Sequence, residues 1–187
     1  MTSFRSISPG EFTTKPVELF GSDWPLLCAG TKDDFNSMTI GWGAVGQIWG
    51  MPYTSVYVRP TRYTHEFMDK YEYFSIVVFD RSFKESLATF GTESGRDIDK
   101  MNFPGLTPDF SYNAPVFHEA NLILICKKMY RQEIDKDLLI SEYKTKVIEE
   151  FYSKGVSYNN FHTIYYGEIT NILSVKMYNG TGSLYTF

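Results

Sequence analysis

The stretch Val58-Arg-Pro-Thr-Arg-Tyr-Thr-His-Glu-Phe67 joins an apparent strand to an apparent helix. Pro60 cannot donate a hydrogen bond to a sheet ladder, so it ends the strand. Thr64 can cap a helix whose apolar face begins with Phe67 and Met68. The stretch therefore predicts a strand, a turn and a helix, and the turn holds two arginines and two threonines.

This turn has the residue types of an anion site. Hydroxyl groups, the free N–H groups of a first helical turn and guanidinium groups together suit a phosphate monoester. The side chains that could form such a site are Arg59, Thr61, Arg62 and Thr64. The alternative is that Thr64 only caps the helix and that the arginines are solvated.

An upstream segment, Phe35-Asn-Ser-Met-Thr-Ile-Gly-Trp-Gly43, could face the same ligand. Gly41 and Gly43 flank Trp42 in a predicted strand, so the backbone could approach a flat ligand while the indole covers one side. An ordinary strand with a bulge is the alternative interpretation.

A third segment, Thr92-Glu-Ser-Gly-Arg-Asp-Ile-Asp-Lys-Met101, again combines helix-start residues with cations. Ser94 and Asp97 are typical of a helix start, and Arg96 and Lys100 supply the positive charge. The alternative for this segment is a capped helix on the surface.

Most of the remaining chain is predicted to form β-strands. Runs of β-branched and aromatic residues, separated by Gly and Pro, indicate six strands. They are Trp24–Ala29, Ser37–Ile48, Tyr53–Val58, Tyr73–Phe79, Ala120–Tyr130 and Phe161–Ile169. Six strands with few helices favour a mainly β fold, an antiparallel barrel. No repeat or linker marks a boundary, so residues 1–187 are expected to form a single domain.

Two more helices have clear sequence signals. Ser82 followed by Glu85 is a capping box, and Gly91 would stand at the C′ position of that short helix. Residues Asp137–Lys154 carry apolar side chains at four-residue steps, which predicts a helix inserted between the last two strands.

The composition limits the possible partners and sites. The formal net charge of −4 gives no general attraction for polyanions, so neither nucleic acid nor a membrane surface is an expected partner. Cys28 and Cys126 have no metal-ligand spacing and predict buried free thiols, and the three histidines offer no metal-binding pair. Because no signal-peptide-like or membrane-spanning apolar run is present, we expect a cytoplasmic protein.

Four segments, in this order and at this spacing, resemble a known family. FNSMTIGWG, VRPTRYTHEF, SGRDIDK and FHTIYYGEI are together similar to the flavin reductase-like proteins of the FMN-binding split-barrel superfamily, on the flavoredoxin side. The similarity runs from about Trp24 to Ile169. It implies a six-stranded antiparallel Greek-key split barrel with a few peripheral helices, a homodimer, and FMN held near the dimer interface.

The resemblance also implies roles for particular residues. The isoalloxazine edge would be met by Asn36, Ser37, Met38 and Thr39, with Trp42 nearby. The FMN phosphate would be held by Arg59, Thr61, Arg62 and Thr64. Further cofactor-binding candidates are Ser94, Arg96 and Lys100, of which Lys100 matches a cation near the flavin.

His162 is the candidate catalytic residue. It stands where related reductases carry the histidine of a Gly-Asp-His triplet, although Asn160 and Phe161 precede it here. This departure leaves its handling of a nicotinamide open. The alternative is a half-buried sheet residue.

The function implied is that of an FMN-binding oxidoreductase, an NADH- or NADPH-dependent flavin reductase that transfers hydride through flavin N5. The sequence carries no motif of a hydrolase, a P-loop protein or a Rossmann dehydrogenase. One alternative is an FMN-bearing electron-transfer protein that receives electrons from another protein and does not turn over nicotinamide. A second is a ligand-binding barrel without redox function.

Overall fold

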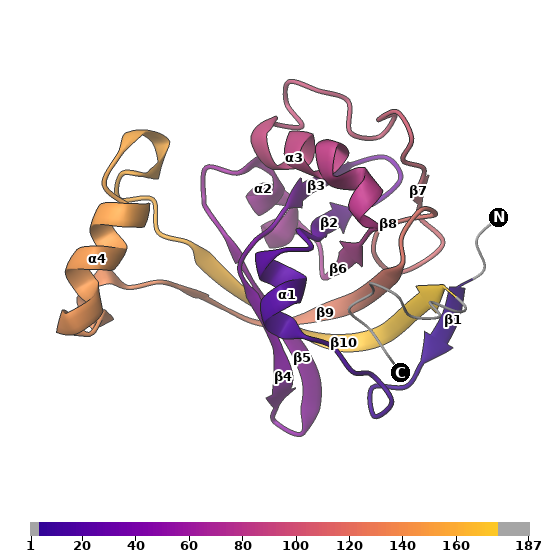
Figure 1. Ribbon diagram of the computed structural model, residues 1–187, viewed down its shortest axis with the longest axis horizontal. Coiled ribbons are helices and arrows are strands. Elements are labelled where there is room, and N and C mark those ends of the chain that lie inside the picture. The colour runs from indigo at the N-terminus through magenta and orange to yellow at the C-terminus, as the bar shows by residue number, and fades with distance from the viewer. Residues whose placement is uncertain (1–3, 176–187) are drawn as a thin grey trace.

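The computed structural model describes residues 4–175, whose main feature is an antiparallel sheet of eight strands (Figure 1). The strands are β1 (Phe4–Ile7), β2 (Leu26–Gly30), β3 (Phe35–Thr39), β4 (Gly43–Ile48), β5 (Met51–Val58), β6 (Tyr73–Val78), β9 (Leu122–Glu133) and β10 (Thr163–Val175). Their order is β3-β2-β6-β9-β10-β5-β4, and β1 pairs with β10. The predicted class, mainly β and antiparallel with few helices, is confirmed.

The sheet has eight strands where six were predicted, for two reasons. The predicted strand Ser37–Ile48 is two strands, because residues 40–42 leave the sheet between β3, which pairs with β2, and β4, which pairs with β5. Strand β1 was not predicted. A separate two-stranded sheet is formed by β7 (Pro108–Asp109) and β8 (Val116–Phe117). Residues 40–42 therefore connect β3 and β4, the two strands at the opposite ends of the sheet order.

The core consists of two hydrophobic clusters, one on each face of β2, β6 and β9. Along β6, Ile76 belongs to one cluster and Val77 to the other. Because both faces are buried, these strands are apolar almost throughout, as in Leu122–Ile125. Cys28 and Cys126 lie in opposite clusters and are buried free thiols, as predicted.

Helices cover parts of the sheet near the break. α1 (Pro16–Gly21) contacts β4, whereas α2 (Tyr63–Lys70) and α3 (Lys84–Thr92) both contact β3. No helix within residues 4–175 is long and apolar enough to cross a membrane.

The start and end of α3 differ from the prediction. The Asp80 carboxylate accepts a hydrogen bond from the Ser82 N–H at 2.9 Å and begins the 3-10 turn η1 (Arg81–Phe83), so the Ser82 capping box is wrong. Gly91 lies within α3 and not at its C′ position. A Cβ on Gly91 would come 3.4 Å from the Thr39 side chain, an ordinary van der Waals contact between α3 and β3.

Thr64 does not cap α2 as predicted. Arg62 occupies the N-cap position, without a capping side-chain hydrogen bond, and Thr64 lies in the first turn of the helix. Its side chain is 1% exposed, and its hydroxyl accepts a hydrogen bond from the Asn36 amide at 2.8 Å. Thr64 therefore joins α2 to β3.

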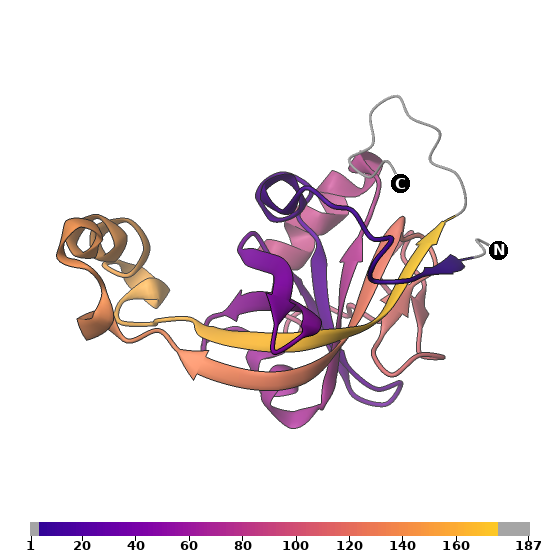
Figure 2. The same cartoon turned by 90° about the horizontal axis from the view of Figure 1, so that it is seen from below.

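Strands β9 and β10 continue beyond the barrel as an arm that carries α4 (Ser141–Phe151) at its end (Figures 1 and 2). Short 3-10 turns, η2 (Lys136–Leu138) and η3 (Gly155–Ser157), flank the helix. The predicted helix Asp137–Lys154 is therefore too long at both ends. At its start, the Asp135 carboxylate accepts the Asp137 N–H at 2.8 Å and holds a 3-10 turn.

Gly43 allows the ring of Phe20 to pack closely against β4. A Cβ at this position would lie 2.3 Å from the ring of Phe20, which is 3% exposed and belongs to α1. At Gly41 the nearest atom to such a Cβ is the Phe20 carbonyl oxygen, at 3.8 Å. The two glycines of the same segment thus have different structural roles.

We expect Gly43→Ala to lower the free energy of unfolding by roughly 1–3 kcal/mol, because the added methyl group would overpack the buried Phe20 ring. Gly41→Ala is the matched control and should change it by less than about 0.5 kcal/mol. Urea unfolding measures both values. Equal effects of the two substitutions would contradict the packing role of Gly43.

Candidate functional site

A pocket of about 150 Å³ lies where the break between β3 and β4 meets the end of β5 and the residue before β10. Six predicted site residues line it: Met38, Thr39, Trp42, Arg59, Arg62 and His162. Ile40, Gly41 and Tyr57 complete the lining and were not assigned from the sequence. Tyr57 could have been found, because strand alternation places it on the same face as Arg59.

Arg59 holds the arm against the pocket. Its Nη1 donates to the Asn160 carbonyl at 3.0 Å, and its Nη2 donates to the Phe151 carbonyl at 2.9 Å. The guanidinium also lies 5.0 Å from the centre of the Tyr152 ring. Burial lowers the pKa of Arg59, and the charge of Arg62 lowers it further. Each of its two terminal amino groups thus donates a hydrogen bond to a backbone carbonyl of the arm.

Thr61, which was predicted to hold a phosphate, contacts the same arm and lies outside the pocket lining. Its hydroxyl accepts a hydrogen bond from the Asn160 amide at 2.5 Å. Asn160 is 8% exposed and also donates to the Val156 carbonyl at 2.9 Å. Asn160, which the sequence marked only as a departure from a family motif, fastens the segment before β10 to the turn after β5.

Arg62 differs from Arg59 in its exposure and contacts. Its side chain is exposed, and Nη1 donates to the carbonyl oxygen of Gly91 at 3.0 Å, near the end of α3. No other N–H group of its side chain has a partner in the described part of the chain. The bond to Gly91 orients the guanidinium at the pocket while leaving it able to bind a ligand.

His162 closes the pocket on the side of β10. Its Nδ1 lies 2.7 Å from the Tyr152 hydroxyl, and its ring centre lies 4.6 Å from that of Trp42. The residue is 7% exposed. Burial lowers the pKa of His162 to about 4, with a further contribution from the charges of Arg59 and Arg62. The imidazole is therefore neutral at neutral pH.

Asn36 is buried behind the pocket and does not line it. It is 2% exposed, and its amide donates a hydrogen bond to the Thr64 hydroxyl. A Cβ on Gly95 would lie 2.1 Å from the Asn36 Oδ1, so Gly95 allows residues 93–97 to approach β3. Asn36 and Thr64, which the resemblance assigned to the FMN site, thus join β3 to α2 outside the pocket lining.

Ser37 and Lys100 form a second buried contact behind β3. Lys100 is 4% exposed, and its Nζ donates to the Ser37 carbonyl at 2.9 Å and to the Phe90 carbonyl at 3.1 Å. The Ser37 hydroxyl is buried without a hydrogen-bond partner among the described residues. Burial lowers the pKa of Lys100 to about 8, and the charge of Arg62 contributes. Lys100 joins β3 to α3 and does not line the pocket.

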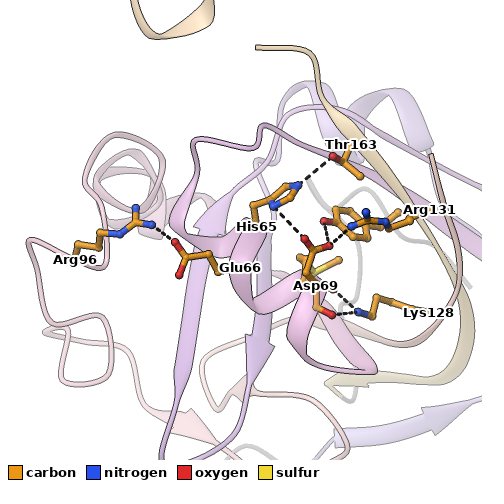
Figure 3. Close-up of polar contacts among 9 residues, drawn as sticks. His65, Glu66, Asp69, Arg96, Lys128, Arg131 and Thr163 are labelled. Carbon is orange, nitrogen blue, oxygen red and sulfur yellow. Dashed lines mark hydrogen bonds and ion pairs between the residues drawn. The ribbon is translucent and has the colours of Figure 1, made fainter. Parts of the chain in front are cut away.

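Ser94 and Arg96 also lie outside the pocket lining. They form a turn and not the predicted helix start, with the Ser94 hydroxyl accepting the Arg96 N–H at 3.1 Å. The Arg96 guanidinium pairs with Glu66 and lies 4.2 Å from the centre of the Tyr63 ring (Figure 3). Arg96 thus packs on the outer surface of α2.

A polar cluster on the other side of α2 fixes this helix to β9 and β10. Figure 3 shows His65 between Asp69 and Thr163, with Nδ1 3.5 Å from the Asp69 carboxylate and Nε2 3.0 Å from the Thr163 hydroxyl. Arg131 donates to Asp69 at 2.6 Å, and Tyr165 does so at 2.7 Å. Because Thr163 follows His162, the cluster couples the first turn of α2 to the pocket.

The pocket can donate hydrogen bonds and positive charge but has no carboxylate in its lining. Its polar side chains are two guanidinium groups, a neutral imidazole, an indole, a phenol and a threonine hydroxyl. The Thr39 hydroxyl donates to the Leu87 carbonyl at 2.5 Å. This set of groups suits an anionic ligand with oxygen acceptors.

The lowered pKa of Lys100 predicts a pH dependence of stability. The unfolded lysine titrates near its ordinary pKa of about 10.5, so between pH 8 and that value the unfolded chain binds a proton that the folded chain does not. The native protein should therefore gain stability relative to Lys100→Met as pH rises from 8 to 10.5, by about 3 kcal/mol in total. Urea unfolding of both proteins across this range measures the difference. If the difference in the free energy of unfolding stayed constant or fell as pH rose, the pKa of Lys100 would not be lowered in the folded protein.

Comparison with known proteins places the fold and the family. The sequence matches the family model for the flavin reductase like domain over residues 18–186. No curated protein sequence shows significant similarity to the chain.

Three solved structures illustrate the shared fold. Flavoredoxin from Methanosarcina acetivorans is 21% identical, with a TM-score of 0.65 over 87% of this chain and 73% of that one. An FMN-binding protein from Thermus thermophilus, solved with p-hydroxybenzaldehyde, is 17% identical, with a TM-score of 0.62 over 98% and 87%. The styrene monooxygenase flavin reductase from Pseudomonas putida S12 is 16% identical, with a TM-score of 0.57 over 81% and 79%. The match to the family model covers most of the sequence, and the chain belongs to the flavin reductase like domain family.

Proposed function

We propose that this chain is an FMN-binding oxidoreductase that reduces its flavin with NADH or NADPH. The observation that carries the proposal is the pocket itself. Arg62, His162 and Trp42 line a site that has hydrogen-bond donors, positive charge and an aromatic face but no carboxylate. A phosphate monoester joined to a flat ring system matches all three properties. The family of the chain supports the same ligand.

Within this proposal the two arginines have separate tasks. Arg62 holds the phosphate, because most of its N–H groups remain available while Gly91 orients it. Arg59 contributes positive charge but uses its terminal amino groups to hold the arm. Thr39 and Trp42 form the wall for the ring system. When bound, FMN would accept a hydride from the nicotinamide, and the protein would bind, orient and shield it.

A second function, electron transfer without nicotinamide turnover, is favoured by a specific observation. Two flavoredoxins are among the structures with a similar fold, with TM-scores of 0.65 and 0.61. In this alternative the same pocket holds FMN, and another protein supplies the electrons.

Anaerobic titration separates the two functions. We expect NADH or NADPH to bleach the absorbance of the FMN-loaded protein at one equivalent per flavin, since each nicotinamide delivers two electrons. A flavin that dithionite bleaches but neither nicotinamide does would support the electron-transfer alternative. A protein that binds no FMN would overturn both functions.

The role of Arg62 is tested by comparing FMN with riboflavin, which lacks the phosphate. Charge-assisted hydrogen bonds contribute roughly 1.5–3 kcal/mol, so Arg62→Ala should weaken FMN binding by about one to two powers of ten. Riboflavin binding should be nearly unchanged. Isothermal titration calorimetry gives the four dissociation constants.

Arg81→Ala, which alters an exposed arginine outside the pocket lining, is the matched control and should leave both ligands unaffected. If Arg62→Ala weakened FMN and riboflavin equally, the arginine would support the pocket and not recognise the phosphate. If it weakened neither, the turn would have no part in binding.

A further inference from the structure

The arm places one side chain directly on the ring that closes the pocket. Tyr152 follows α4 and is 3% exposed, and its hydroxyl lies 2.7 Å from His162 Nδ1. The Arg59 guanidinium lies over the Tyr152 ring and donates to the carbonyl oxygen of Phe151. Phe151 in turn meets Trp42 edge to face, with ring centres 5.1 Å apart. Tyr152 is therefore held by contacts to both its hydroxyl and its ring.

The contacts of the two groups fix the direction of this hydrogen bond. Burial and the nearby arginines lower the pKa of His162 to about 4, so the neutral ring carries one N–H. Burial raises the pKa of Tyr152, which keeps its hydroxyl protonated. If Nδ1 carried the ring proton, the buried hydroxyl hydrogen would lose the only acceptor that the described residues give it.

The remaining ring nitrogen is the one available to a ligand. Nδ1 is used by Tyr152, and Nε2 of His162 has no hydrogen-bond partner among residues 4–175. His162 lines the pocket beside both arginines. A proton on Nε2 therefore adds a neutral donor to a site that already carries two positive charges.

We propose that Tyr152 is a positioning residue that donates its hydroxyl proton to Nδ1 and thereby holds His162 in the tautomer with the proton on Nε2, ready to donate to an oxygen acceptor of the bound ligand. The identity of that ligand as FMN rests on the function proposed above. The tautomer itself is a property of the ligand-free protein. The arm thus determines the hydrogen-bonding character of a pocket that it borders.

The tautomer can be read without any ligand, from the ¹⁵N chemical shifts and ¹H–¹⁵N couplings of the histidine rings. The signals of His162 are assigned by their loss in His162→Gln. We expect the native ring to carry its proton on Nε2, and Tyr152→Phe to move it, wholly or in part, to Nδ1. Tyr158→Phe, at an exposed tyrosine of the same arm, is the matched control and should change nothing. A native Nδ1–H ring, or a tautomer that Tyr152→Phe leaves unchanged, would overturn the proposal.

Ligand binding tests the donor role of Nε2. Loss of one neutral hydrogen bond should weaken FMN binding about three- to tenfold in Tyr152→Phe. His162→Gln, whose amide nitrogen can replace Nε2–H, should bind FMN more tightly than His162→Asn, whose amide is too short. Equal loss in both histidine variants, with melting temperatures unchanged, would overturn the donor role. A native protein that shows the expected tautomer but binds no FMN would refute the proposed function and leave the Tyr152 assignment standing.

Discussion

The pairing of β10 with strands on both sides is the constraint on which the pocket depends. β10 pairs with β9 along one edge and with β5 along the other, and Thr163 lies opposite both Glu133 and Val58. This register places the turn that begins at Arg59 beside the residues that precede β10. A shift of one residue would reverse the faces of the strand and remove Tyr165 from the core. The same register that buries the core therefore also brings Arg59 to the Asn160 carbonyl.

The positive charges around the pocket are held by carbonyl oxygens. Arg59 donates to Asn160 and Phe151, Arg62 donates to Gly91, and Lys100 donates to Ser37 and Phe90. A carbonyl oxygen accepts a hydrogen bond from a cationic side chain and fixes its direction without neutralising the charge. A carboxylate would fix the direction and also neutralise the charge. The surface pairs are different, since Arg96 and Arg131 are matched by Glu66 and Asp69. Positive charge thus remains unmatched where an anionic ligand would bind, and it adds to the effect of burial in lowering the pKa of His162.

Features set by local sequence were predictable, whereas features set by distant contacts were not. Alternating and continuous apolar runs gave the sheet, and Pro60 marked the end of β5. The break at residues 40–42 escaped prediction because Ile40 and Trp42 suit a strand as well as a connection. It becomes visible only when β4 pairs with β5 and not with β2.

The site followed the same pattern. Arg62, Trp42 and His162 were placed at one pocket by the prediction and by the structure. The resemblance assigned Asn36 and Thr64 to the FMN site. In the structure the Asn36 amide donates to the Thr64 hydroxyl and neither residue lines the pocket. A polar residue in a strand carries no local signal that distinguishes contact with a ligand from contact within the protein. The role of Tyr152 depends on an arm whose sequence predicted only a helix.

The pocket can form only late in folding, because the arm that completes it is far in sequence from the turn after β5. Arg59 is separated by 92 positions from Phe151 and by 101 from Asn160. Contacts over such separations require the closure of a long loop. The chain loses conformational entropy on closure before the contacts form and offset that loss, so topologies of this kind fold slowly. During synthesis on a ribosome, the turn after β5 emerges well before the segment that completes it. The barrel strands β2 and β6 can pair in that interval, but the pocket is assembled only when β10 joins. A ligand of this pocket can therefore stabilise the folded protein but cannot guide the early steps of folding.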